Sequence, residues 1–274
     1  MSIEVPPLRF LKQLQNFKNL KKGFEVVYSN HGEKPLNQNI SRLCILDSSF
    51  NPPTKGHLTL VSKTIDYYTQ DQKTSIDDIH VVLLLAINNA DKLPKPAQFE
   101  SRLDMMALFA DHIQQKFEVP VTVALTEYPK FIDKAKALET WVDSWVPDMS
   151  KVRFAFLVGF DTLIRIFNPK YYTALPISQA LNEFIQRNDT FCLTRSDEAN
   201  ESITDQFKYV QDIADGKTDL PTSWADKIHL MENDPDALAI SSSEVRDGVE
   251  KADDDWKTHV TDEVARYIIN EKVY

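Results

Sequence analysis

The residues with the most chemical potential lie in the stretch SSFNPPTKGH at positions 48–57. A short apolar run at 43–46 precedes it and has the composition of a buried parallel strand. The asparagine and two prolines cannot continue that strand, and Thr54 is a good N-cap for the helix predicted by the apolar spacing at 58–68. The first helical turn leaves N–H groups free, with Thr54 and His57 on one face. This strand-turn-helix predicts a cradle for the phosphates of a nucleoside triphosphate.

A second stretch, ISSSEVR at 240–246, predicts another helix start. Its serines supply hydroxyl and main-chain donors at the positive end of the helix dipole, and Arg246 lies one turn further on the same face. Such an array suits the β- and γ-phosphates. Each stretch also has an ordinary interpretation: His57 as a polar surface residue, and Ser241 with Glu244 as a capping box. Because the two stretches occur together, the sequence favours a divided phosphate site.

Composition limits the class of protein. With 31 basic and 41 acidic residues the formal net charge is −10, so the surface repels a polyanion and we expect no nucleic acid partner. No apolar run approaches the roughly 20 residues of a membrane span, and the first residues lack the apolar core of a signal peptide. We therefore expect no membrane partner and a cytoplasmic or nuclear location. Cys44 and Cys192 lie in apolar runs and are expected to be reduced core residues. The oligomeric state stays open, a homo-oligomer included.

Glycine is scarce, with six in 274 residues, so each position carries more information than usual. Gly56 and Gly159 lie at the carboxyl ends of predicted strands, where open α/β sheets bind their ligands. Gly56 is expected to let a ligand approach the backbone. The dinucleotide motif G-x-G-x-x-G and the P-loop motif are both absent from the sequence. A bound nucleotide therefore needs a different cradle.

Strand-like runs alternate with helical patterns, which predicts an α/β fold with a doubly wound, Rossmann-like parallel sheet. Residues 1–40 are predicted to form an N-terminal helical extension and residues 41–274 one α/β domain. The apolar stripe of the extension, flanked by basic residues, could lie on a membrane surface, but we favour a helix packed at the edge of the sheet. Segments 29–40 and 196–222 are polar and are predicted to be loops. The predicted strands are 43–47, 79–86, 120–125, 152–158, 190–194 and 227–231, and the clearest helices are 57–69, 99–116, 134–146 and 260–270.

The two stretches resemble the signatures of the nicotinamide mononucleotide adenylyltransferase family of the nucleotidyltransferase superfamily, in particular its eukaryotic and fungal members. Between them, LVGFD at 157–161 resembles the glycine-x-aspartate turn of the family. The run that ends at Arg195 is similar to a late strand of the family, and Lys92 with Arg102 is similar to its lysine loop and the arginine of the following helix. The resemblance covers most of the chain.

The resemblance implies transfer of AMP from ATP to nicotinamide or nicotinate mononucleotide, which gives NAD or its acid analogue and pyrophosphate. Such a transfer needs in-line attack on the α-phosphorus, for which a protein supplies position and positive charge. Mg²⁺ is implied on the ATP phosphates, with no metal ligand from the protein itself. The implied catalytic residues are Thr54, His57 and Arg246. The implied ATP-binding residues are Ser49, Phe50, Lys55, Gly56, His57, Gly159, Asp161, Ser241, Ser242, Ser243 and Arg246, and those for the pyridine nucleotide are Ser48, Ser49, Lys92, Arg102, Tyr128, Tyr172 and Arg195.

The chain departs from the family at two places. Ser48 stands where the first turn usually has glycine, so its side chain must fit there or narrow the pocket. Tyr172 replaces one of two tryptophans that stack on the pyridine ring, and Tyr128 is the nearest match to the other. Two alternatives follow: a nucleotide-binding regulator, either non-catalytic or ATP-hydrolysing, and an adenylyltransferase for another phosphate acceptor. The acidic charge disfavours an aminoacyl-tRNA synthetase, which uses a similar cradle.

Overall fold

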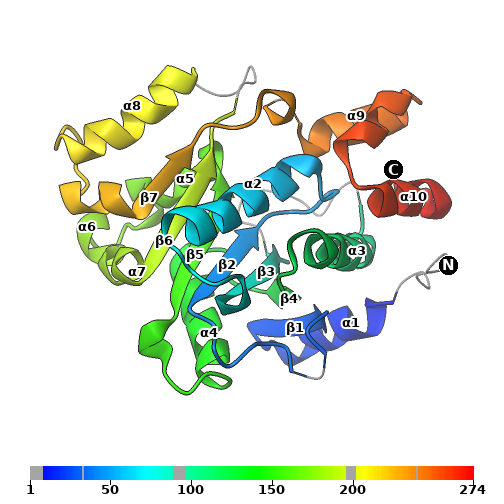
Figure 1. The fold of residues 1–274 in the computed structure, drawn as a ribbon, viewed down its shortest axis with the longest axis horizontal. Helices are drawn as coiled ribbons and strands as arrows, with labels where there is room; N and C mark the ends of the chain where they lie inside the picture. Colours follow the sequence, from blue (N-terminus) through cyan, green and yellow to red (C-terminus); the bar gives the residue numbers. More distant parts are fainter. Residues whose placement is uncertain (1–8, 33, 89–96, 196–201, 239) are drawn as a thin grey trace.

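Figure 1 shows a central sheet with helices on both faces in the computed structural model of the chain. The structure describes residues 9–32, 34–88, 97–195, 202–238 and 240–274. Within these ranges the sheet has seven strands in the order β1-β4-β3-β2-β5-β6-β7. β1 is antiparallel to β4, and the other neighbouring pairs are parallel, which confirms the predicted fold class. The strands are β1 (Phe24–Ser29), β2 (Arg42–Asp47), β3 (Ile79–Ala86), β4 (Val121–Thr126), β5 (Arg153–Gly159), β6 (Asn188–Leu193) and β7 (Ile228–Met231).

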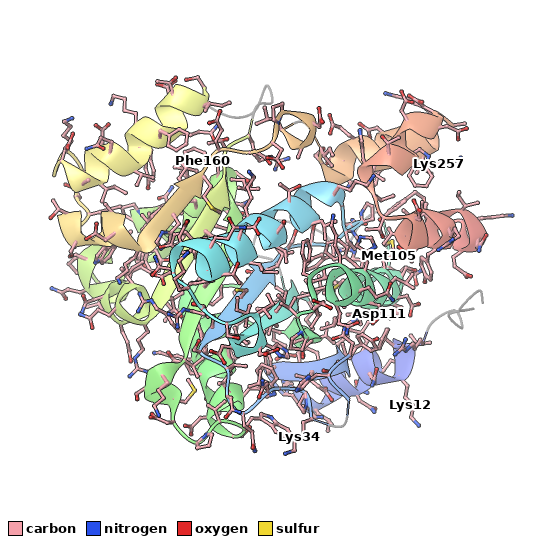
Figure 2. All side chains as sticks on the ribbon, in the orientation of Figure 1. Lys12, Lys34, Met105, Asp111, Phe160 and Lys257 are labelled. Atoms are coloured by element: carbon pink, nitrogen blue, oxygen red, sulfur yellow. The ribbon has the colours of Figure 1, made fainter. Side chains whose placement is uncertain are left out.

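Two apolar layers cover the sheet because alternate strand residues point to opposite faces. Leu46 of β2 belongs to one layer and Ile45 to the other. The central strands are therefore apolar along most of their length, as strands buried on both faces must be. The first layer is completed by α1 (Leu11–Leu20), α2 (Lys55–Asp66), α3 (Phe99–Phe117) and α10 (Asp262–Glu271), and Met105 of α3 lies within it (Figure 2). The second is completed by α4 (Phe131–Asp143), α5 (Phe160–Ile166), α7 (Asn182–Arg187) and α8 (Ile203–Ala214). Two further helices are α6 (Ile177–Ala180) and α9 (Ser242–Glu250).

The N-terminal segment contributes a strand as well as a helix. Leu14 and Phe17 of α1 are buried, and α1 packs beside α3, which agrees with a helix packed at the edge of the sheet. β1 then pairs with β4, with Phe24 opposite Thr126, so this segment extends the sheet of the α/β domain. β1 was not among the strands predicted from the sequence, because it is short and mostly half-buried. No helix in the described ranges has the length and apolar character needed to cross a membrane.

The predicted loop at 196–222 contains a helix, α8, over Ile203–Ala214. Ser202 caps it by accepting a hydrogen bond from the Asp205 N–H. The helix was missed because only a narrow face is buried, represented by Ile213, while Phe207 stays 40% exposed. Polar residues therefore dominate its sequence and hide the helical spacing.

Candidate active site

A cavity with a volume of about 710 Å³ lies at the carboxyl ends of the parallel strands. Leu46 and Asp47 at the end of β2, and Gly159 at the end of β5, form part of its wall. β2 lies between β3 and β5, where the order of the strands reverses. Open α/β sheets bind ligands at such a reversal. The cavity therefore has one side toward β5 and β6 and another toward β3 and β4.

The turn at 48–57 brings His57 to the cavity through local contacts. His57 Nδ1 accepts a hydrogen bond from the Thr54 N–H at 3.0 Å and lies 2.9 Å from Thr54 Oγ1. Because a main-chain N–H can only donate, the proton of the neutral imidazole is on Nε2. His57 Nε2 lies 2.9 Å from Ser48 Oγ. His57 therefore carries an N–H donor at the cavity wall, directly beside Ser48.

His57 is uncharged at neutral pH. Burial, with the positive charge of Arg195 as a second cause, lowers its pKa from 6.5 to about 4. The ring packs on Phe50, with ring centroids 5.4 Å apart. Phe50 has a φ of 45°, a left-handed conformation that is costly for an aromatic residue and that turns the chain out of β2. Positive charge in this cradle must therefore come from the helix ends and arginines, and not from the imidazole.

α9 begins beside the first cradle and is attached to it by two hydrogen bonds to main-chain oxygens. Ser242 Oγ donates to Pro52 O at 2.7 Å, and Arg246 Nη1 donates to Asn51 O at 2.8 Å. Arg246 Nη2 also donates to Ser243 Oγ at 3.0 Å. The two stretches singled out by the sequence are thus joined directly, across nearly 200 residues of chain.

The capping box and Gly56 explain why the two helix starts lie so close. Ser241 Oγ accepts from the Glu244 N–H at 3.2 Å, and Glu244 Oε2 accepts from the Ser241 N–H at 2.9 Å, so Ser241, which follows Ile240, is the N-cap of α9. A Cβ on Gly56 would lie 3.2 Å from Ile240 O, which is tighter than ordinary contact. The missing side chain at 56 thus allows α2 to pack against this segment, and Gly56 also lies at the cavity wall. Two positive helix ends meet at one wall of the cavity.

Gly159, Asp161 and Arg195 come together on the side of β5 and β6. A Cβ on Gly159 would lie 3.0 Å from Asp161 Oδ1 and 3.9 Å from Arg195 Nη1, so glycine leaves room for both side chains. Asp161 Oδ2 accepts from Arg165 Nη2 at 2.8 Å. The amide of Gln206 fixes the main chain of Arg195, accepting from its N–H at 3.1 Å and donating to its O at 2.6 Å. A ligand hydroxyl would meet an Asp161 carboxylate that Arg165 has already oriented.

Arg102 of α3 lies on the side of β3 and β4 and is only 5% exposed. Its Nε donates to Ala97 O at 3.0 Å, and its guanidinium carbon lies 4.9 Å from the centroid of the Phe99 ring. Burial lowers the pKa of Arg102. Nη2 has no hydrogen-bond partner in the described part of the chain. A buried guanidinium with an unused N–H at a cavity wall suits an anionic ligand.

Tyr172 lines the same cavity as an aromatic surface. Its Oη donates to Ile166 O at 2.8 Å, which holds the ring in place. Burial raises its pKa to about 12, so the phenol stays neutral. Tyr172 therefore presents a fixed, uncharged ring.

Asp47 and Lys134 form a buried ion pair at the cavity wall, and neither residue was among the predicted site residues. Lys134 Nζ forms an ion pair with Asp47 Oδ2, and the side chains are 5% and 7% exposed. The ammonium also lies 4.7 Å from the centroid of Phe131, another wall residue. The sequence carried a signal for this pair: Lys134 falls four residues before Leu138, on the buried stripe of α4, and a lysine on such a stripe needs a buried partner.

Asn51 is a second residue that the sequence analysis did not single out. It is 4% exposed, and its Oδ1 accepts from Tyr274 Oη at 2.9 Å and from the Ala97 N–H at 3.4 Å. Its main-chain oxygen is the one bound by Arg246. Asn51 therefore ties the first cradle to the start of α9, to the segment after α10 and to the segment before α3.

Three predicted site residues are not brought to the cavity wall. Phe50 is fully buried behind His57, and Lys55 lines a separate surface groove beside α2. The Tyr128 side chain is not at the cavity wall and packs on Gly23, where an added Cβ would lie 2.6 Å from Tyr128 Oη. Phe131 is the nearby aromatic residue that lies at the wall. Lys92 is outside the described residues. The other predicted residues all line the cavity: Ser48, Ser49, Thr54, Gly56, His57, Arg102, Gly159, Asp161, Tyr172, Arg195, Ser241, Ser242, Ser243 and Arg246.

Comparisons with known proteins find similarity over most of the chain. A family model described as cytidylyltransferase-like matches residues 45–248. A protein of Schizosaccharomyces pombe named "putative nicotinamide mononucleotide adenylyltransferase" is 30% identical over 218 residues, which is 79% of each chain. Two solved structures of Plasmodium falciparum nicotinic acid mononucleotide adenylyltransferase, complexed with APC and with NaAD, are each 19% identical and cover 85% of this chain. Their TM-scores are 0.53 and 0.52, and 96% and 97% of those chains are covered, which shows a shared fold.

Proposed function

This chain belongs to the cytidylyltransferase-like family, and from that premise we propose that it is a nicotinamide-nucleotide adenylyltransferase. It transfers AMP from ATP to nicotinamide mononucleotide, or to the acid analogue, and releases pyrophosphate. The relative from Schizosaccharomyces pombe supports this activity by its name and its coverage of most of the chain. The structural observation that carries the proposal is the meeting of α2 and α9 at one wall, joined by Ser242 and Arg246.

We define the phosphate side of the cavity as the starts of α2 and α9, residues 48–57 and 241–246. In the transfer, a phosphate oxygen of the mononucleotide attacks the α-phosphorus of ATP, and the bond to the pyrophosphate oxygen breaks. The attacking phosphate is already ionised, so no general base is needed. The helix ends and Arg246 stabilise negative charge on the leaving pyrophosphate, and His57 donates its Nε2–H to a phosphate oxygen without changing its own protonation.

We define the acceptor side as the part of the wall formed by Asp47, Arg102, Phe131, Lys134 and Tyr172. In-line attack requires that the mononucleotide approach opposite to the leaving pyrophosphate. The unused Nη2 donor of Arg102 suits its phosphate, and the rings of Phe131 and Tyr172 suit a planar pyridine. Asp161, on the side of β5, suits a ribose hydroxyl of ATP.

A divalent cation, which we propose to be Mg²⁺, would neutralise the β- and γ-phosphates when bound with ATP. Among the described residues, no group of three or more histidine, cysteine, aspartate or glutamate side chains lies close enough together to hold a metal ion. Asp161, the acidic residue nearest to Gly159 at the wall, is paired with Arg165. The phosphates themselves are therefore the best ligands for the cation.

The test is a product assay with the purified chain, ATP, Mg²⁺ and each of the two mononucleotides in turn. We expect a dinucleotide and pyrophosphate in equal amounts, separated by chromatography. Consumption of ATP to ADP and phosphate, with no dinucleotide from either mononucleotide, would contradict the proposal.

One observation favours a second candidate, a nucleotide-binding regulator without transfer. Ser48 Oγ accepts a hydrogen bond from the Nε2–H of His57, and this N–H is the donor that the transfer would use. A regulator of this kind would bind ATP and form no product with either mononucleotide. The same assay, combined with a measurement of ATP binding, separates the two candidates.

A further inference from the structure

Ser48 changes the hydrogen bonding of His57. Nδ1 of His57 accepts from the Thr54 N–H, so Nε2 carries the proton, and Nε2 lies 2.9 Å from Ser48 Oγ. His57 therefore donates and the Ser48 hydroxyl accepts. A glycine at 48 would leave this donor facing the cavity. In this chain the donor is already occupied by a side chain of the protein.

Ser48 is not needed to hold the imidazole. The ring is fixed from its other edge by the Thr54 N–H at 3.0 Å, and one face packs on Phe50, which is fully buried. These contacts set the position and the tautomer of the ring. The hydroxyl of Ser48 therefore acts only at the donor end of His57, where a ligand would bind.

The main chain at Ser48 is held in place. Its N–H donates to Leu84 O at 3.4 Å, which continues the pairing of β2 with β3. The preceding residue, Asp47, is buried in its ion pair with Lys134. Rotation about the Cα–Cβ bond of Ser48 can break the hydrogen bond between its hydroxyl and His57. The main chain of Ser48 is fixed, so it cannot move the hydroxyl away from His57.

We propose that Ser48 sets the affinity of the site for ATP, because its hydroxyl competes with a nucleotide phosphate for the Nε2–H of His57. The inference rests on the proposed use of ATP, but not on transfer to a mononucleotide. ATP must displace one neutral hydrogen bond to reach His57, so removal of the hydroxyl tightens ATP binding by about threefold to tenfold. Because of Ser48, the site is therefore half-saturated only at a higher concentration of ATP.

The experiment is a double-mutant cycle on ATP affinity. Calorimetric titration with ATP and Mg²⁺, without mononucleotide, gives Kd for the full chain and for Ser48→Ala, His57→Ala and the double variant. We expect Ser48→Ala to lower Kd by about threefold to tenfold, and we expect the same change to alter Kd by less than about twofold once His57 is alanine. Ser49→Ala is the matched control: this neighbouring hydroxyl also lines the cavity, and its loss should not tighten binding.

Each possible result of the titrations either supports or overturns the role of Ser48. Weaker or unchanged ATP binding in Ser48→Ala would overturn the proposal, since the hydroxyl would then be a ligand of ATP or a bystander. Equal tightening with and without His57 would also overturn it, because the effect would not pass through the imidazole. If Ser48→Ala melts at a clearly lower temperature, Ser48→Gly replaces it in the cycle. The titration needs no product, so a chain that makes no dinucleotide still gives an answer, whereas a chain that does not bind ATP refutes both this inference and the proposed function.

Discussion

The phosphate side of the cavity is built from main-chain groups, hydroxyls, one imidazole and the half-buried Arg246, whereas the acceptor side is built around an almost fully buried ion pair. On the phosphate side, Ser242 and Arg246 bind the oxygens of residues 51 and 52, and the free N–H groups of two helix ends supply positive potential. On the acceptor side, Asp47 and Lys134 are almost completely removed from solvent. Helix ends carry their polarity without side-chain burial, but buried ions must be paired to be tolerated. We therefore expect changes on the phosphate side to lower turnover, and changes on the acceptor side to lower stability first.

The largest effect on stability is expected from Lys134→Met. The change leaves the Asp47 carboxylate buried without its partner, which should lower the free energy of unfolding by about 3–5 kcal/mol. The double variant Asp47→Asn, Lys134→Met removes both charges and should recover most of the loss. Urea unfolding measures all three, and Lys136→Met, at an exposed position on the same helix, is the control. A loss in Lys134→Met no larger than that in the control would show that the pair is not the feature that stabilises this side.

On the phosphate side, His57→Ala should lower kcat by about 10²-fold, because it removes a donor aimed at a phosphate oxygen. The melting temperature should change little by comparison with Lys134→Met, since the ring is half-buried at the cavity wall. His57→Gln, which can keep a side-chain N–H, should retain part of the activity. Steady-state assays of dinucleotide formation give the result, and turnover equal to that of the unchanged chain would remove His57 from the mechanism.

Arg246→Ala should also lower kcat by about 10²-fold, through the loss of charge beside the leaving pyrophosphate. It removes the hydrogen bond to Asn51 O as well, so the two helix starts become less firmly joined. Arg246→Lys keeps the positive charge but lacks the planar guanidinium, so its kcat should lie between that of the unchanged chain and that of Arg246→Ala. Arg266→Ala, at a mostly exposed position on α10, is the matched control in the same kinetic assay. A large loss of kcat in Arg266→Ala, or no loss of kcat in Arg246→Ala, would contradict a role for Arg246 in stabilising the leaving pyrophosphate.

The two sides also differ in how far the sequence predicted them. The starts of α2 and α9 were predicted because capping, helix dipoles and serine spacing are local properties, readable within ten residues. The sheet followed from the alternation of apolar strands and helices. Residues 24–29 and the helix at 203–214 were missed because each buries only a narrow face.

The acceptor side could not be predicted from local pattern in the same way. The pair of Asp47 and Lys134 joins residues 87 positions apart, and its partners are set by how α4 packs on the sheet. Tyr128 was chosen by its nearness to the expected position in the sequence, but Gly23 on a neighbouring segment leaves space that its ring fills. Which way a side chain after a strand turns depends on such distant contacts, and these become visible only in the folded chain.

A smaller effect is expected for Gly56→Ala, which tests the contact between the two helix starts. The new Cβ would lie 3.2 Å from Ile240 O, so α2 and the segment before α9 must separate slightly. Alanine is the better helix former by about 1 kcal/mol, which offsets the tight contact, so the free energy of unfolding should change by less than about 1 kcal/mol. The value of kcat/KM should nevertheless fall by about threefold, because catalysis is sensitive to small displacements. A clear loss of stability with unchanged kcat/KM would show that the contact is only structural.

The smallest effect on turnover should be the response of the phosphate side to pH near neutrality. The pKa of His57 is about 4 in the folded chain, against 6.5 for a free histidine, so between these values the unfolded chain binds a proton that the folded chain does not. The stability contributed by neutral His57 is therefore complete above pH 6.5 and is lost as pH falls toward about 4. Subtracting the unfolding curves of His57→Gln from those of the unchanged chain isolates this loss from that of other histidines. Because the imidazole stays neutral through roughly pH 6 to 8, His57 should add no step near 6.5 to the pH profile of kcat/KM. A step there that disappears in His57→Gln would mean that the imidazole titrates in the free enzyme, and that the phosphate side uses its charge after all.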